Sequence, residues 1–255
     1  MKLQRLTEAF LIGFASGRSR TYPYLWSCDG ELSIMHDAER PQHKGYRRTE
    51  IVDVDGDPVS VASAAAELAD RIGPAASRWF LCAIRTEPED ELAHIESEYK
   101  RLGFRLTARE VLFSHSLQLE APAHPVPHEI STIRSREEAA DFFRQAGLKL
   151  NTYDWNAIES GQVRRYVCRK DGEQVGSVAS VQAGEKTRWV SALWVHEEHR
   201  RRGIGTALMR ALLQGDSDAG DSLSVLLASK DGAQLYPTLG YERKGTLLLY
   251  QKPKT

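Results

Sequence analysis

The stretch that most restricts how this chain can fold is HRRRGIGTALMRALL, residues 199 to 213. After its arginines and glycines, apolar residues follow at the spacing of a helix with one buried face, at Ile204, Ala207, Leu208, Ala211 and Leu212. A helix leaves its first N–H groups without intrahelical partners, and its dipole places partial positive charge at that end. Gly203 and Gly205 have no Cβ to hold a bulky anion away, and the neighbouring arginines add charge-assisted hydrogen bonds. The stretch therefore predicts a site for a pyrophosphate group.

Two common phosphate-binding motifs do not fit these residues. No Gly-Lys-Ser/Thr follows the glycines, and Leu208 stands where the third glycine of the dinucleotide fingerprint would fall. An exposed basic helix start after a glycine turn is the simpler alternative. The flanks favour the anion site, because TRWVSALWV (187–195) and LSVLLAS (223–229) both read as strands. Together with the helix they form a βαβ unit whose anion site lies at the C-terminal edge of the first strand.

A longer pattern carries a family resemblance. Arg200-x-x-Gly203-x-Gly205 follows the strand, and Ala233-x-Leu235-Tyr236-x-x-Leu239-Gly240-Tyr241 comes further on. This combination resembles the GNAT acetyltransferase superfamily over residues 128 to 255. The remaining elements fit that order, with a strand at 129–135, a helix at 136–147, a hairpin at 164–184 and a final strand at 245–253. The expected fold class is α/β (α+β), a mixed central sheet flanked by helices.

The resemblance implies acetyl-CoA as co-substrate. Its pyrophosphate would lie on backbone N–H groups of residues 201 to 206, and its pantetheine arm would lie beside the strand at 193–195. The cofactor-binding residues that the resemblance implies are Leu193, Trp194, Val195, Arg200, Arg201, Arg202, Gly203, Ile204, Gly205, Thr206 and Ala207. A backbone N–H near Leu193 to Val195, beside a bulge, would stabilise the oxyanion.

The resemblance also implies that Tyr236 is the general acid that protonates the departing CoA thiolate. A core tyrosine with a satisfied hydroxyl is the alternative. If Tyr236 is the general acid, an ordinary tyrosine pKa near 10 would set the alkaline limit of the rate.

The general base is not evident. Many relatives place a Glu or His on the strand where this chain has Thr187, Arg188, Trp189 and Ser191. His196 and Glu197 follow the strand and are weak candidates; a water relay, or an acceptor with a low amine pKa, would also serve. Lys230 stands where relatives often carry an Asn that contacts the cofactor.

The acceptor site is expected in LKLNTYDWNAIESG, residues 148 to 161, where Tyr153, Asp154 and Trp155 could hold a cationic or aromatic amine. An exposed loop with one packed tryptophan is the alternative. The expected function is N-acetyl transfer to an amine of a small molecule or amino-acid-like acceptor. A non-catalytic acetyl-CoA-binding sensor and an interaction scaffold remain as alternatives.

The first half of the chain resembles a second, degenerate GNAT copy. YKRLGFRLTAREVLF (99–113) aligns with YPTLGYERKGTLLLY (236–250), with Tyr, Leu, Gly and an aromatic residue in register. Its phosphate loop would be VDVDGDPVSV (52–61), whose three aspartates would repel a pyrophosphate. We therefore expect a degenerate domain at 1–119, a linker at 120–127, an acetyl-CoA-binding domain at 128–255, and one cofactor per chain. The first domain would be a scaffold, a dimer surface or one wall of the acceptor site.

Composition limits the partners. The formal net charge of −1, with acidic and basic residues interleaved, gives no reason to expect nucleic acid or a membrane as partner. Three widely spaced cysteines favour reduced thiols and a cytoplasmic location. The histidines and cysteines lack metal-ligand spacing, so no metal is expected.

Overall fold

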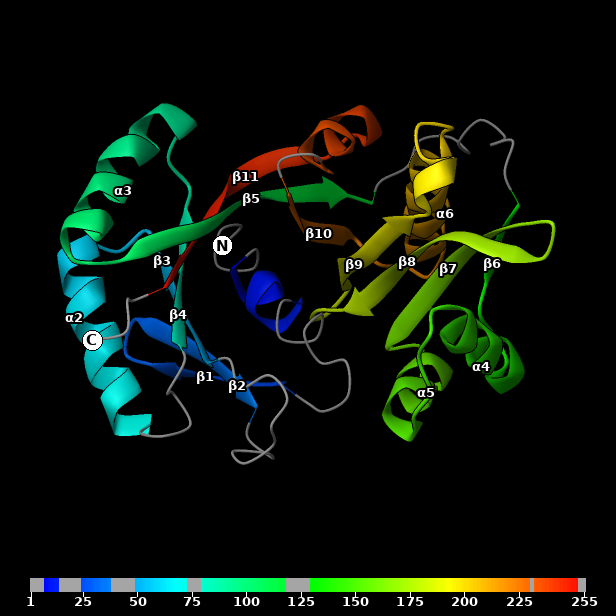
Figure 1. Cartoon of the computed structure of the whole chain (residues 1–255), viewed down its shortest axis with the longest axis horizontal. Helices are drawn as coiled ribbons and strands as arrows, with labels where there is room; N and C mark the ends of the chain where they lie inside the picture. Colours follow the sequence, from blue (N-terminus) through cyan, green and yellow to red (C-terminus); the bar gives the residue numbers. More distant parts are fainter. Residues whose placement is uncertain are drawn as a thin grey trace. The chain divides into compact units, whose positions relative to one another are not determined.

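The computed structural model describes residues 7–13, 24–37, 49–72, 79–117, 129–229 and 232–251. Its contacts divide the chain into two compact units. Unit 1 comprises residues 1–21, Ser114–Leu226 and Leu235–Tyr241; unit 2 comprises Tyr22–Phe113, Leu227–Gln234 and Glu242–Thr255. Each unit has a mixed sheet flanked by helices, which confirms the predicted fold class (Figure 1).

Unit 1 holds most of the second half of the sequence. Its strands follow the order β10-β9-β8-β7-β6, antiparallel except for the parallel pair β9 and β10. Its elements are β6 (Ile130–Thr132), α4 (Arg136–Gln145), α5 (Thr152–Glu159), β7 (Val163–Lys170), β8 (Glu173–Gln182), β9 (Thr187–Val195), α6 (Ile204–Asp218) and β10 (Leu223–Ala228). The predicted strand at 129–135 is therefore reduced to three residues, and the acceptor segment contains a helix, α5, where a loop was the alternative.

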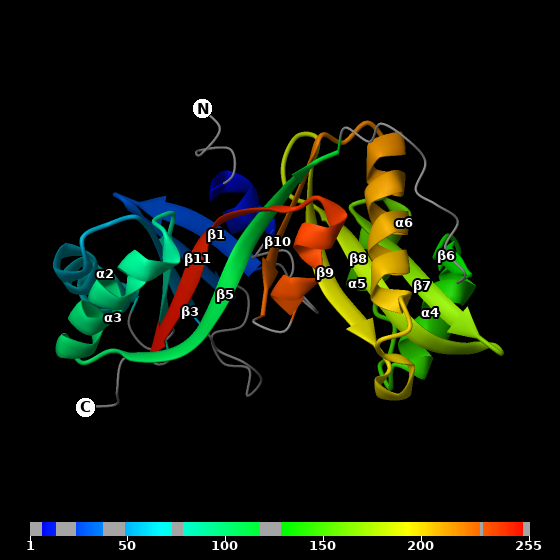
Figure 2. The same cartoon turned by 90° about the horizontal axis from the view of Figure 1, so that it is seen from above.

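The helices of unit 1 lie on opposite faces of its sheet. Figures 1 and 2 show α6 on one face and α4 with α5 on the other. Side chains of β7 alternate accordingly: Arg164 donates to Asp216 of α6 over 2.8 Å, whereas Val167 packs with Phe142 and Phe143 of α4. The buried residues of α4 are Ala139, Phe142 and Phe143, which recur at the spacing of one helix face.

Side chains cap the N-termini of both helices on this face, α4 and α5. Ser135 and Glu138 form a capping box at the start of α4. The Asn151 side chain accepts from the Asp154 N–H over 2.8 Å and so caps α5.

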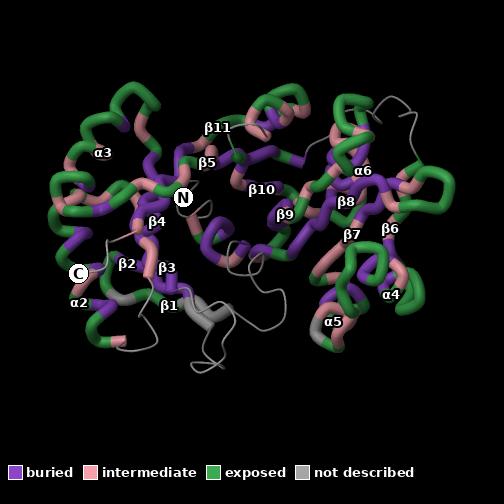
Figure 3. Tube along the Cα trace, viewed as in Figure 1, coloured by how far each residue is buried: buried purple, intermediate pink, exposed green. Residues whose placement is uncertain are grey.

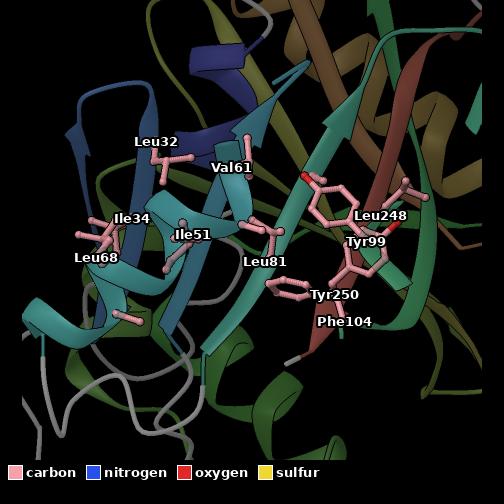
Figure 4. Packing of buried hydrophobic residues seen from close by; sticks show 14 residues of the cluster. Leu32, Ile34, Ile51, Val61, Leu68, Leu81, Tyr99, Phe104, Leu248 and Tyr250 are labelled. Atoms are coloured by element: carbon pink, nitrogen blue, oxygen red, sulfur yellow. The ribbon is translucent and has the colours of Figure 1, made fainter. Parts of the chain in front are cut away.

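Unit 2 has the strand order β1-β2-β3-β4-β11-β5. Its elements are β1 (Tyr24–Asp29), β2 (Leu32–Asp37), β3 (Thr49–Val54), α2 (Pro58–Ile72), β4 (Trp79–Arg85), α3 (Leu92–Arg101), β5 (Arg105–Ser116) and β11 (Glu242–Gln251). Figure 4 shows its core, where Leu81 and Leu248 of the sheet meet Leu68 of α2 and Tyr99 of α3. Figure 3 shows buried strands and exposed outer helix faces.

The last strand of the chain belongs to unit 2, not to the unit that holds most of residues 128–255. β11 pairs antiparallel with β4, with Leu248 opposite Ala83 and Tyr250 opposite Leu81. The last residues of β5, from Ser114 on, belong in turn to unit 1. This division differs from the predicted boundaries 1–119 and 128–255, because strand pairing joins segments far apart in sequence. The predicted linker, 120–127, lies outside the described residues.

We expect a fragment of residues 128–255 not to fold on its own. It would expose the β11 side chains Leu248 and Tyr250, which are 0% and 1% exposed in the whole chain. It would also lose Phe10, whose ring packs edge-on against Trp189 of unit 1 with centroids 5.8 Å apart. Circular dichroism should show no cooperative thermal unfolding, with the full chain as control. A fragment that unfolds cooperatively and binds CoA would contradict the expectation.

Candidate functional site

The loop between β9 and α6 places backbone N–H groups at a helix start. Arg201 and Gly203 have φ of 63° and 80°, in the left-handed region that gathers successive N–H groups on one side. Gly203 is the N-cap of α6. The first hydrogen bond of the helix runs from the Ala207 N–H to the Gly203 carbonyl over 2.9 Å. The N–H groups of residues 204–206 therefore have no acceptor within the helix. The Arg200 Nε donates to the Val195 carbonyl over 3.1 Å and ties the loop to the strand.

The end of β9 is bulged and separates from β10. Ser191 pairs with Ala179 and Trp194 with Ser177, so that two residues of β9, Ala192 and Leu193, stand opposite one residue of β8. Ala192 has a φ of 53°. Within the described strands, β9 pairs with β10 only as far as Trp189. Among the described residues, the backbone of β9 after Trp189 therefore has no strand partner in β10.

A cavity of about 1130 Å³ lies on the α4 and α5 side of the unit 1 sheet. β9 lines it with Ser191, Ala192 and Trp194, and His196 follows directly after the strand. The Val195 side chain lies instead beside the start of α6. Its Cγ2 is 3.9 Å from the position that a Cβ on Gly205 would take. One end of β9 therefore serves both the cavity and the arginine-glycine loop.

The wall of the cavity that β7 and α5 form carries one positive and one negative side chain. Asp154 of α5 and Arg165 of β7 both line it. Burial raises the pKa of Asp154, while the Arg165 guanidinium and the Asn151 hydrogen bond act in the opposite direction. The Arg165 guanidinium carbon lies 4.7 Å from the centroid of the Phe142 ring and 5.7 Å from that of Phe143. Among the described residues, no group of three or more His, Cys, Asp or Glu could hold a metal ion.

Tyr236 lies in a short 3-10 helix, η5 (Tyr236–Leu239). Its ring packs edge-on against Tyr241, with centroids 5.6 Å apart, and the neighbouring Leu235 lies 3.7 Å from a Cβ built on Gly205. Burial raises the pKa of Tyr236 to about 12. Tyr236 thus stays in its proton-donating form at neutral pH, beside the first turn of α6.

The corresponding loop of unit 2 is already occupied by its own carboxylates. At the start of α2, Asp57 accepts hydrogen bonds from the Ser60 N–H over 2.9 Å and from the Ser60 hydroxyl over 3.0 Å. These two hydrogen bonds lower the pKa of Asp57. Asp55 accepts from the Thr86 N–H over 2.8 Å. Gly56 has no room for a side chain, since a Cβ there would lie 2.4 Å from an Asp53 carboxylate oxygen. A second anion would meet negative charge at this helix start.

Comparisons with known proteins agree with this geometry. Residues 162–243 match the family model of the acetyltransferase (GNAT) domain. A GCN5-related N-acetyltransferase from Kribbella flavida has a similar structure, with a TM-score of 0.66 and 19% identity over 97% of this chain and 96% of that chain. A tandem GNAT protein from the clavulanic acid biosynthesis pathway gives 0.54 and 14% over 99% and 96%. Residues 162–243 thus resemble a GNAT domain, and the whole chain shares the fold of these solved structures.

Other comparisons add little beyond the GNAT fold. A GCN5-related N-acetyltransferase from Sphaerobacter thermophilus gives a TM-score of 0.59 and 15% identity over 88% of this chain and 78% of that chain. A search among curated proteins gave no match. The match over residues 162–243 agrees with the predicted GNAT resemblance, and the chain shares the fold of a tandem GNAT protein. Among the described residues, no helix is long and apolar enough to cross a membrane.

The structure brings most of the predicted GNAT site residues together, at the end of β9 and the start of α6. Of the predicted acceptor residues, Asp154 lines the cavity, whereas Trp155 packs against the apolar cluster around Phe142. The Tyr153 side chain and Lys230 lie outside the described residues. Arg165 was not singled out from the sequence, although its position two residues from both Val163 and Val167 places it on the same face of β7 as these apolar residues.

Proposed function

We propose that this chain is an N-acetyltransferase that moves the acetyl group of acetyl-CoA to the amine of a small, amino-acid-like acceptor. One observation carries the proposal. The bulged end of β9 lines the cavity through Ser191, Ala192 and Trp194 and continues directly into the loop at the start of α6. A donor held by the loop would thus present its acyl end to an acceptor in the cavity.

The residues present fit acetyl-CoA, which GNAT proteins use as donor. Backbone N–H groups of residues 204–206 and the side chains of residues 200–202 would hold the pyrophosphate. Residues 193–195 would run beside the pantetheine arm. The backbone conformation at position 203 requires glycine, because a φ of 80° is strained for residues with a side chain.

The chemistry needs three protein contributions. A backbone N–H beside the bulge at Ala192 and Leu193 donates to the oxyanion as the amine attacks the thioester carbonyl. Tyr236 protonates the CoA thiolate as the carbon–sulfur bond breaks. The amine loses its own proton within the cavity, where His196 and Asp154 are groups that can accept it.

A second function is binding of acetyl-CoA without turnover, as in a sensor. The cavity face of β9 itself favours this alternative, because Ser191, Ala192 and Trp194 offer no general base.

Two assays distinguish these functions. We expect CoA to raise the thermal midpoint, since a ligand at 100 times its Kd stabilises by about 2.7 kcal/mol. We also expect an amine panel to release CoA thiol from acetyl-CoA. Stabilisation without release would favour the sensor, and the absence of both would contradict both functions.

We expect one CoA to bind per chain, at the α6 loop. The carboxylates of Asp55 and Asp57 lie where a second pyrophosphate would have to bind, and like charges repel. Titration calorimetry of the full chain measures the stoichiometry. Two equivalent sites would show that the unit 2 loop also accepts the cofactor.

A further inference from the structure

Arg165 is a charged residue of the cavity wall that the proposed chemistry does not use. It lies on β7 at a half-buried position, and its guanidinium is held near the rings of Phe142 and Phe143 at 4.7 and 5.7 Å. Such contacts restrict a long side chain to few orientations. A guanidinium held in this way presents its N–H donors in a fixed planar fork, which matches a carboxylate.

The charges around Arg165 favour an anion on this wall. Arg144, Lys149 and Arg165 are the basic lining residues, against Asp154 and Glu173. Arg144 is bonded to Asp141, and its side chain is 74% exposed, which places its charge toward water. Lys149 and Glu173 are exposed as well, whereas Arg165 and Asp154 are both half-buried, so we take this pair as the charges that face a bound molecule.

We propose that the acceptor is an amino acid, with Arg165 binding its carboxylate and Asp154 facing its amino group. This inference rests on the proposed function, because it names the substrate class of the same site. A zwitterion offers a carboxylate to Arg165 and an ammonium group to Asp154, whereas a simple amine offers only the ammonium group. Arg165 is thus the residue that selects amino acids over amines.

The test compares acceptors that differ only in the carboxylate. Phenylalanine and phenethylamine form one pair, and leucine and isopentylamine another. We expect wild-type kcat/KM to favour the amino acid by about 10- to 100-fold, the range of a charge-assisted hydrogen bond. Arg165→Gln should bring the ratio close to one, and Arg165→Lys should leave an intermediate ratio because it keeps the charge but loses the fork.

The control is Arg169→Gln, on the same strand. Arg169 donates to the Ser131 hydroxyl over 2.9 Å and does not line the cavity. This variant should keep the wild-type ratio. Thermal unfolding of each variant shows whether it is folded, and a merely structural Arg165 would change the thermal midpoint without changing the ratio.

A binding measurement separates this inference from the proposed function. Calorimetry with N-acetylphenylalanine and N-acetylphenethylamine, in the presence of CoA, needs no turnover. We expect tighter binding of the carboxylate compound to the wild type, and loss of this preference in Arg165→Gln. If no amine is acetylated but the preference persists, the carboxylate site stands and the transferase proposal fails. Equal binding of both compounds to the wild type, or an unchanged preference in folded Arg165→Gln, would overturn the inference.

Discussion

Gly203→Glu should abolish CoA binding, with a loss in affinity of at least about 100-fold, or about 2.7 kcal/mol. The N-cap position has a φ of 80°, which a glutamate adopts only with strain. Its carboxylate would also lie at the start of α6, as Asp57 lies at the start of α2, where it would compete with the pyrophosphate. Calorimetry with CoA measures the change.

The matched control for Gly203→Glu is Asp55→Ala in the other unit. Asp55 is exposed and bonds to Thr86, far from α6 in sequence. This variant should keep CoA affinity within about twofold, because exposed substitutions away from a site usually have small effects. Unchanged affinity in folded Gly203→Glu would show that the loop is not the cofactor site.

Tyr236→Phe should lower kcat by about two orders of magnitude. Placed general acids contribute about 10²–10⁴-fold, and CoA thiolate leaves well enough unaided to favour the lower end. The change keeps the ring that packs on Tyr241, so CoA affinity and the thermal midpoint should stay close to wild type. Full activity with a good acceptor, with chemistry shown to be rate-limiting, would mean that Tyr236 is a core residue.

The pH dependence follows from the burial of Tyr236. A tyrosine acid works in its protonated form, and burial moves its pKa from 10.0 to about 12. The sequence alone predicts that kcat falls near pH 10, where an ordinary tyrosine loses its proton. The raised pKa moves this loss of the protonated Tyr236 to higher pH. Wild-type kcat should therefore show no decline from tyrosine ionisation at pH 10. A decline centred there, absent from Tyr236→Phe, would contradict the buried environment.

The elements of unit 1 could be predicted from sequence because their signals are local. The strand at Thr187–Val195 has the predicted bounds, and α6 begins at Ile204, directly after the glycine that the motif places at its cap. The hairpin turn at Asp171 and Gly172 has φ of 52° and 82°, as a two-residue hairpin turn requires.

Other features depend on contacts between distant residues. Nothing local in β11 indicates that it pairs with β4 rather than with a strand of its own half. Likewise, Arg165 becomes a site residue only because α4 and α5 cover its face of the sheet. The 3-10 geometry at Tyr236 is consistent with Pro237, which lacks the N–H that a longer helix would use.

The most direct test of the central claim is where the acetyl group goes. The full chain is incubated with acetyl-CoA labelled in its acetyl group and a mixture of amino acids and amines, and the products are identified by mass spectrometry. We predict the label on the nitrogen of an acceptor, with Gly203→Glu giving none. Unlabelled acceptors, from a chain that binds CoA under the same conditions, would contradict acetyl transfer.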